Sequence, residues 1–229
     1  MPLGGECCAK RIGPRCPLVR HREITPRVNG AVFLSTVTPC FTPGTLIATD
    51  KGQRPVETLT RGDLVVTRDN GLRRIHWTGR RSFTYSEIGE EADLQPILIR
   101  RDAFGEGYPA RDMIVSPTHR FLVGIDMTPL TDGADEALIA AKDLLDGTRV
   151  KQAPVLGVTY IHFLCNAHEV VMANGAWTES FHPDDRIMRN MAEPQRQELL
   201  ALFPEIETIG AALRFRSART IIRKSRFDR

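Results

Sequence analysis

Several features that mark other classes of protein are missing from this chain of 229 residues. No apolar run approaches the roughly 18–20 residues that span a bilayer. The first residues also lack the apolar core, roughly 7–15 residues long, of a classical signal peptide. These absences predict no membrane span and no classical secretion. A cytoplasmic location is then the default expectation, and leaderless export is the alternative.

Cysteine is scarce, and the five residues are Cys7, Cys8, Cys16, Cys40 and Cys165. An odd number without a secretory signal argues against a disulfide framework. Three of the cysteines and His21 lie close together near the start of the chain. Their spacing fits no standard zinc pattern, so we predict no metal site and no cofactor.

Basic residues gather at the end of the chain. Residues 213–229 hold seven Lys or Arg and one acidic residue, although the whole chain has a net charge of only +3. No nucleic-acid motif accompanies them. We therefore interpret this stretch as a solvated terminal segment, with contact to nucleic acid or an anionic lipid surface as the alternative.

The pattern of turns and apolar runs divides the chain into three parts. Residues 1–37 are interrupted by Pro and Gly and predict a flexible leader. Residues 38–182 predict an all-β domain, because short β-rich runs alternate with turn residues. Expected strands cover 45–49, 55–59, 64–67, 73–83, 96–100, 112–116, 120–124 and 158–164, followed by a hairpin over 168–177 that turns at Asn174 and Gly175. Residues 183–229 predict a basic tail with a short amphipathic helix over 193–203.

Cys40 stands at the boundary between the leader and the first strand. Its thiolate would lie next to the carbonyl of Pro39, where attack turns the amide into a thioester, an N-to-S acyl shift. Taken alone, such a cysteine is more often a small buried apolar residue.

Two further clusters contain groups that suit acid–base chemistry. Ser116 and His119 lie at a bend between two strands, where the imidazole could protonate a departing amide nitrogen. His162, Cys165 and His168 flank a second bend. Taken alone, these histidines could instead be structural groups or ligands of a metal.

Together the clusters resemble the Hint domain shared by inteins, Hedgehog C-terminal domains and bacterial intein-like proteins. The matching segments are CFTPGTLI (40–47), PVETLTRGDLV (55–65), SPTH (116–119), VTY (158–160), HEV (168–170) and ANG (173–175). Their order and spacing are specific, and the resemblance covers about 60% of the chain, residues 38–182. The pattern is most similar to stand-alone bacterial Hint proteins.

The resemblance implies a horseshoe-like β fold and a role for each matching residue. Cys40 would be the nucleophile, His119 would activate the scissile amide, and Ser116 would be its polar companion in place of the usual Thr. His168 occupies a late position that often holds a catalytic polar residue. We expect His162 and Cys165 to be structural or to support the site from behind.

Three departures from the family narrow the expected reaction. Splicing inteins end in His-Asn before the next residue, whereas this chain has AWTES at 176–180, which excludes full splicing. Pro39 is a hindered acyl donor, and no sterol-recognition region follows. We expect a single-turnover self-cleavage at Pro39–Cys40, with the chain's own N-terminal segment as substrate. The alternative is an inactive Hint fold that serves as a binding or sorting module.

Overall fold

The fold was analysed in a computed structural model, which describes residues 38–91, 94–124 and 135–223. The chain divides into two units, Met1–Phe33 and Leu34–Arg229, and every described residue belongs to the second. The expected leader, residues 1–37, lies outside the described residues, as do Cys7, Cys8, Cys16 and His21.

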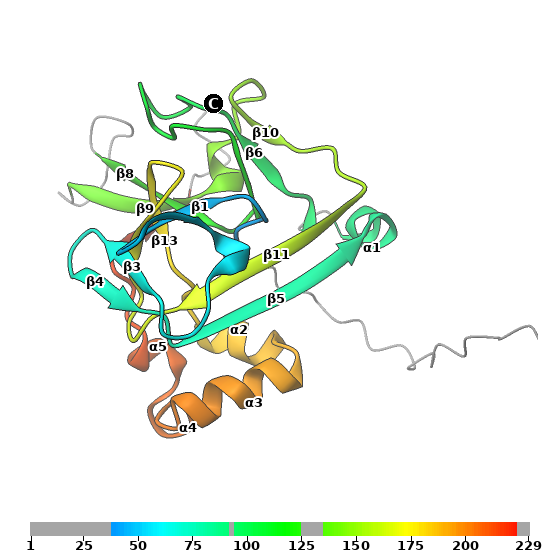
Figure 1. The fold of residues 1–229 in the computed structure, drawn as a ribbon. Helices are drawn as coiled ribbons and strands as arrows, with labels where there is room; N and C mark the ends of the chain where they lie inside the picture. The colour runs from blue at the N-terminus through cyan, green and yellow to red at the C-terminus, as the bar shows by residue number, and fades with distance from the viewer. Residues whose placement is uncertain (1–37, 92–93, 125–134, 224–229) are drawn as a thin grey trace, which may run out of the picture. The chain divides into compact units, whose positions relative to one another are not determined.

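Among the described residues, short strands form most of the regular secondary structure (Figure 1), which confirms the expected all-β class. The strands are β1 (Leu46–Thr49), β2 (Gly52–Pro55), β3 (Leu64–Thr67), β4 (Gly71–Arg74), β5 (Trp77–Thr84), β6 (Ile97–Ile99), β7 (Met113–Val115), β8 (Arg120–Gly124), β9 (Glu136–Ala140), β10 (Val150–Gln152), β11 (Gly157–Leu164), β12 (Val170–Ala173), β13 (Ala176–Glu179) and β14 (Thr220–Ile222). The helices are α1 (Tyr85–Glu90), α2 (Asp185–Asn190), α3 (Glu193–Leu202), α4 (Ile206–Ile209) and α5 (Ala211–Arg214), with 3-10 turns at Val56–Thr58 and Ala141–Leu144. Over the described part of the chain, no helix is long and apolar enough to cross a membrane.

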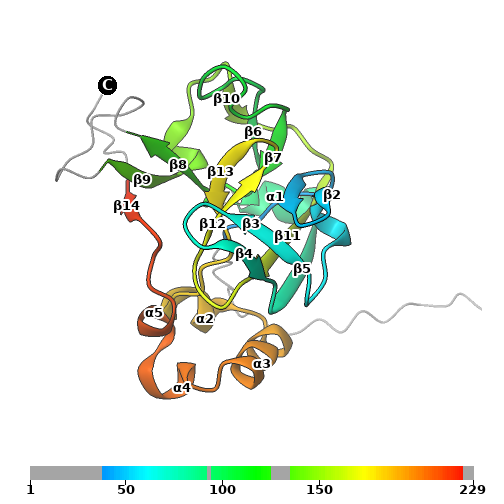
Figure 2. The ribbon, with the colours of Figure 1, turned by 60° about the vertical axis from the view of Figure 1, so that its left-hand side comes forward.

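The strands form three sheets from pairings that are mostly distant in sequence. The largest runs in the order β14-β9-β8-β13-β12-β1-β3-β4, with β2 paired to β1 (Figure 2). A second sheet has the order β10-β6-β7, and the long strands β5 and β11 form a third. Segments separated by more than a hundred residues therefore meet at the centre of the domain.

The hairpin expected at 168–177 is present as β12 and β13. Ala173 pairs with Ala176, and the two turn residues have positive φ, 47° at Asn174 and 83° at Gly175. Asn and Gly are the residues that tolerate this conformation best. The Asn174 side chain also joins distant segments, because it accepts a hydrogen bond from the Leu46 N–H (2.8 Å) and donates one to the Asp112 carbonyl (3.2 Å).

The return strand expected over 73–83 is two strands in different sheets. β4 ends at Arg74 and pairs with β3, whereas β5 begins at Trp77 and pairs with β11 over eight residues. The break occurs at Ile75, which is fully buried, and at His76, whose N–H donates to the Leu164 carbonyl (2.8 Å). Local periodicity does not reveal this change of partner.

Phe41 connects the sheets beside the first candidate residue. Its N–H donates to the Ile161 carbonyl (2.8 Å) and its carbonyl accepts from the Ile161 N–H (2.9 Å), so it is held against β11. It also forms a bridge to Val115 at the end of β7. Cys40 is thereby fixed between the end of β7, where Ser116 follows, and the middle of β11.

The C-terminal segment packs on the β domain. Its helices bury Leu199, Phe203 and Phe215 in one apolar cluster with Trp77 and Phe181. α3 confirms the helix expected over 193–203. In Figure 2 the chain leaves α5 and joins the large sheet as β14, which pairs in parallel with β9.

The interpretation of 213–229 as a solvated segment is wrong for the part that the structure describes. Arg219 contacts Asp69 (2.7 Å) and Glu136 (3.0 Å), and Arg214 pairs with Glu205. The net charge of this stretch does not reveal these pairs, because Glu205, Asp69 and Glu136 all lie outside it in the sequence. Ion pairs to the rest of the domain hold this segment in place.

The turn at Asn174 gives a first prediction. Asn174→Ala should lower the free energy of unfolding by about 2–4 kcal/mol, because it removes two hydrogen bonds and forces Ala into positive φ. Asn174→Gly removes the same bonds without the backbone cost and should lose about 1–2 kcal/mol less. Urea denaturation measures both. Equal losses for the two variants would show that backbone strain plays no part.

Candidate active site

The thiol of Cys40 lies in a buried polar niche. Its Sγ is 3.2 Å from Nδ1 of His162 and 3.1 Å from the Thr38 hydroxyl. Only 2% of the residue is exposed. Burial raises the pKa of Cys40 to about 12. The resting group is therefore a neutral thiol, which would need a base to remove its proton before it could act as a nucleophile.

Ser116 holds the backbone on both sides of Pro39. The Cys40 N–H donates to Oγ of Ser116 (2.9 Å), and the Ser116 hydroxyl donates to the Thr38 carbonyl (2.8 Å). The Ser116 N–H in turn donates to the Cys40 carbonyl (3.0 Å). One fully buried residue thus fixes the peptide unit that joins Pro39 to Cys40.

His162 is the imidazole in contact with the thiol, which differs from the expectation that it would only support the site. It lies on β11 and packs against the rings of Trp77 and Phe181, with centroid distances of 5.0 and 4.7 Å. Its pairing partner on β5 is Gly79, where a Cβ would come within 2.2 Å of Nε2 of His162. Only glycine leaves room for the ring.

Burial also sets the charge state of His162. It lowers the pKa of His162 to about 4, so the imidazole is neutral at physiological pH. A neutral imidazole 3.2 Å from a neutral thiol can accept its proton through Nδ1. The contact between Cys40 and His162 therefore has the geometry that a nucleophile–base pair requires.

His119 is fixed in one tautomer by Thr178. The Thr178 hydroxyl donates to the Arg120 carbonyl (2.7 Å), so it can only accept from Nε2 of His119, which carries the ring proton. Nδ1 is then a lone pair, buried and without a partner among the described residues. Burial lowers the pKa of His119 to about 4, and its ring packs on Phe41 at 4.4 Å.

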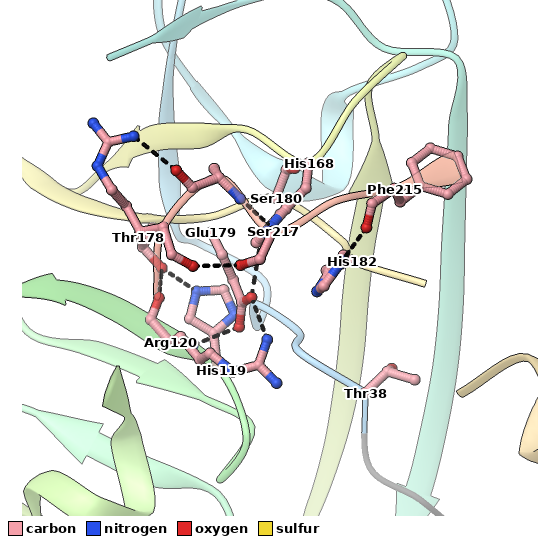
Figure 3. A network of polar contacts seen from close by, with 12 residues as sticks. Thr38, His119, Arg120, His168, Thr178, Glu179, Ser180, His182, Phe215 and Ser217 are labelled. Atoms are coloured by element: carbon pink, nitrogen blue, oxygen red, sulfur yellow. Dashed lines mark hydrogen bonds and ion pairs between the residues drawn. The ribbon is translucent and has the colours of Figure 1, made fainter. Parts of the chain in front are cut away.

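His168 belongs to a buried network that is linked to His119 through Thr178, Arg120 and Glu179 (Figure 3). Its Nδ1 accepts from the Ala218 N–H (3.1 Å), and its Nε2 lies 3.2 Å from Glu179. Glu179 also accepts from the backbone N–H and the guanidinium of Arg120, both at 2.8 Å. No described contact joins His168 to Cys40. The network instead holds Arg120, the residue after His119.

Opposing effects keep Glu179 charged in this network. Burial alone would raise the pKa of Glu179, but the hydrogen bond from His168 and the charge of Arg120 hold it below its ordinary value. The carboxylate is thus a buried anion with cationic and N–H partners on three sides.

A metal ion would not fit His168, Glu179 and His182, although their ligand atoms lie within 4.8 Å of one another. The two imidazole rings are stacked, 4.2 Å apart with an angle of 6° between their planes. Lone pairs of parallel stacked rings lie in separate planes and do not point at one common ion. His182 also uses Nε2 to contact the Phe215 carbonyl at 2.6 Å.

Cys165 lies in the largest apolar cluster and is fully buried. Burial raises its pKa to about 12, so it is a neutral thiol. This placement matches the structural role expected for it.

The geometry above belongs to a chain that matches the Hint domain family profile over residues 39–185. The match covers more than half of the chain. This chain belongs to the Hint domain family. Membership of this family supports an autoprocessing-type domain in general terms.

Several solved structures are similar to this Hint domain. The bacterial intein-like domain from Clostridium thermocellum has 13% identity and a TM-score of 0.42, and the match covers 63% of this chain and 99% of that one. The gp41-1 intein has 14% identity and a TM-score of 0.36, with coverage of 62% and 98%. A DnaB intein from Synechocystis sp. PCC 6803 has 11% identity and a TM-score of 0.40, with coverage of 62% and 99%. No curated protein sequence matches the chain.

The contact between Thr178 and His119 gives a second prediction. We expect His119 to carry its proton on Nε2 in the folded protein, as ¹⁵N NMR of the ring would show. Thr178→Val removes the acceptor and the partner of the Arg120 carbonyl, so it should release the tautomer and cost about 1–3 kcal/mol of stability. Thr178→Ser, which keeps the hydroxyl, should preserve both. A His119 protonated on Nδ1 in the unmodified chain would contradict this assignment.

Proposed function

We propose that this Hint domain cleaves itself at Pro39–Cys40 through an N-to-S acyl shift, without splicing. One observation carries the proposal. The hydroxyl of Ser116 bonds both the Cys40 N–H and the Thr38 carbonyl, while the Cys40 thiol lies 3.2 Å from His162. The peptide bond to be broken, the nucleophile and a base are therefore held by one buried set of contacts.

The first step is an isomerisation in which all atoms are conserved. The Cys40 thiol gives its proton to Nδ1 of His162 as Sγ attacks the carbonyl carbon of Pro39. The bond between that carbon and the Cys40 nitrogen then breaks, and the nitrogen receives a proton. The product is a thioester between Pro39 and Cys40 with a free amine on Cys40. The thiol and the imidazole are both uncharged at rest, so the proton can pass directly from Sγ of Cys40 to Nδ1 of His162 inside the buried niche.

His119 and His168 have no described contact with the thiol and have less direct roles in this proposal. The resemblance to inteins assigns activation of the scissile amide to His119. In the tautomer that Thr178 selects, Nδ1 of His119 is an acceptor, so it protonates the departing nitrogen only after it has itself taken up a proton. His168 acts through Glu179 and Arg120, which hold the loop that carries His119. It is a positioning residue, whereas Cys40 and His162 touch the reacting atoms.

The residues at the end of the domain support cleavage without splicing. Where splicing inteins have Asn, this chain has Thr178, Glu179 and Ser180, each fully buried. Thr178 and Glu179 bond the segment around His119, and the Ser180 hydroxyl accepts from the Glu169 N–H (2.9 Å). None has an amide side chain that could cyclise, so the reaction stops at cleavage.

An inactive binding module is the alternative, and one observation favours it. Burial of Cys40 keeps its thiol protonated, with a pKa of about 12. Without proton transfer to His162 such a thiol would be inert, and the domain would serve only as a folded surface.

Mass spectrometry of the purified chain tests self-cleavage. Dithiothreitol or hydroxylamine should speed release of a leader ending at Pro39 and a fragment of residues 40–229, because both attack thioesters much faster than amides. Cys40→Ala should abolish release, since no thiol remains to accept the acyl group. Cys165→Ala removes the other described thiol and should leave release unchanged. An intact mass after long treatment of the folded protein would favour the inactive module.

The dependence of the cleavage rate on pH tests His162. With a base of pKa about 4 and a thiol of pKa about 12, both partners are neutral between pH 5 and 9 and the rate should be flat. It should fall below about pH 4, where the imidazole becomes protonated. In His162→Ala, solution hydroxide must remove the proton. The rate should then drop by roughly 10²–10⁴ at neutral pH and rise about tenfold per pH unit.

Gly79→Ala tests the same base without removing it. The added Cβ displaces the ring of His162, so the variant should show the pH profile of His162→Ala. Gly124→Ala is the matched control in another strand, because its Cβ would meet no atom closer than 4.0 Å. A flat pH profile in folded Gly79→Ala and His162→Ala would remove His162 from the mechanism.

A further inference from the structure

A hydrogen bond joins helix α3 to one of the rings that pack against the proposed base. The indole N–H of Trp77 donates to the carboxylate of Glu198 on α3 (2.8 Å). We propose that Glu198 is a positioning residue, which acts through Trp77 to keep Nδ1 of His162 directed at the Cys40 thiol. The inference rests on the proposed self-cleavage and extends its machinery to a helix outside residues 39–185, the part that matches the family.

The imidazole of His162 depends on its neighbours for its direction. Nδ1 lies 3.2 Å from Sγ of Cys40, whereas Nε2 is buried without a hydrogen-bond partner among the described residues. Half a turn about the Cβ–Cγ bond would present a carbon, Cδ2, to the thiol in place of Nδ1. Since no second hydrogen bond opposes this turn, the groups packed against the ring must prevent it.

Trp77 is the neighbour that closes the space around this imidazole. The two ring centroids are 5.0 Å apart with an angle of 27° between the planes, and only 5% of Trp77 is exposed. A Cβ at Gly79 would come within 2.2 Å of Nε2 of His162 and within 2.4 Å of Cη2 of Trp77, so both rings reach into the place of the missing side chain. An indole that turned away would leave the imidazole room to rotate.

Glu198 fixes the direction of the indole. Trp has a single donor, Nε1–H, and a turn of the ring would leave this donor unpaired in a largely buried position. A carboxylate is also a stronger acceptor than a neutral oxygen. Glu198 itself is exposed, so its substitution leaves the apolar core intact. The contact can therefore be removed in a folded protein.

Apolar packing brings α3 to the site but gives it no direction. Trp77 and Phe181, the two rings that contact His162, share an apolar cluster with Leu199 of α3. The hydrophobic effect is not directional, so burial in this cluster alone does not select one orientation of the indole. The hydrogen bond to Glu198 does select one.

The pH dependence of leader release, with hydroxylamine in excess, distinguishes positioning from simple support. Glu198→Leu removes the acceptor and should lower the rate about fivefold at neutral pH, the effect of losing one hydrogen bond from the productive orientation. The difference from the unmodified chain should disappear at high pH, because hydroxide then replaces His162 as the base in both chains. A variant that had merely lost folded protein would be slower at every pH.

Conservative and control variants isolate the hydrogen bond. Glu198→Gln keeps an oxygen acceptor and should recover most of the rate. Trp77→Phe keeps a ring against His162 but lacks the N–H, so it should show the loss of Glu198→Leu, and combining the two changes should add little. Glu193→Leu is the matched control on the same helix, because the described hydrogen bonds of Glu193 stay within α3. It should leave the rate unchanged.

Hydrogen exchange of the Trp77 indole N–H, followed by NMR in the uncleavable Cys40→Ala chain, tests the contact apart from the reaction. Exchange should be about tenfold faster when Glu198→Leu is added, because the N–H loses its acceptor. It should stay slow with Glu198→Gln.

The outcomes distinguish failure of this inference from failure of the proposed function. Equal exchange with and without Glu198→Leu, or release by Glu198→Leu at the unmodified rate, would overturn the role of Glu198 while self-cleavage stands. A loss of rate that is equal at every pH, or that Glu193→Leu shares, would indicate a purely structural role and overturn it as well. If the folded, unmodified chain releases no leader, self-cleavage itself is rejected, and the role of Glu198 with it.

Discussion

The pairing of Phe41 with β11 is the constraint on which the site depends. Two backbone hydrogen bonds to Ile161 hold the chain at the centre of the domain immediately after Cys40. With Phe41 fixed, Cys40 has little freedom, and Ser116 at the end of β7 bonds the backbone on either side of Pro39. The folded domain therefore holds the Pro39–Cys40 junction firmly on its Cys40 side. The sheet supplies the preorganisation that an acyl shift between neighbouring residues requires.

Burial then determines the electrostatics of this rigid junction. It moves the pKa of Cys40 up to about 12 and the pKa of His162 down to about 4, so neither group is charged at rest. A thiolate would be costly in this niche, whereas a proton passed directly to His162 is shared within the pair. The aromatic rings of Trp77 and Phe181 hold the base in place of a second hydrogen bond. Packing thus performs the orientation that a carboxylate provides in many nucleophile–base pairs.

The sequence predicts the all-β class and the 173–176 turn, because these depend on local residues such as Asn174 and Gly175. It also brings Cys40 and Ser116 together through their motifs. The contact between His162 and Cys40 could not be predicted. β11 is buried on both faces, so alternation does not show which way His162 points, and the pairing of His162 with Gly79 depends on a strand about eighty residues away. A Gly inside a strand, followed by a His in another strand, is at best a weak signal of close approach. The ion pairs of the C-terminal segment could not be predicted for the same reason, because Arg219 and Asp69 come together only in the folded chain.

At the end of the domain, β13 has a structural role at the position where splicing inteins have a reactive residue. In splicing inteins this stretch supplies the Asn that cuts the second junction, and it must therefore be free to react. Here Thr178 and Glu179 are buried and engaged with His119, Arg120 and His168. Thr178, which fixes the tautomer of His119, and Glu179, whose buried carboxylate contacts Arg120 and His168, cannot also leave the core to react. Stabilising the first half of the site in this way leaves no group for the second reaction, so the packing of this stretch, like the missing Asn, supports the proposal of cleavage without splicing.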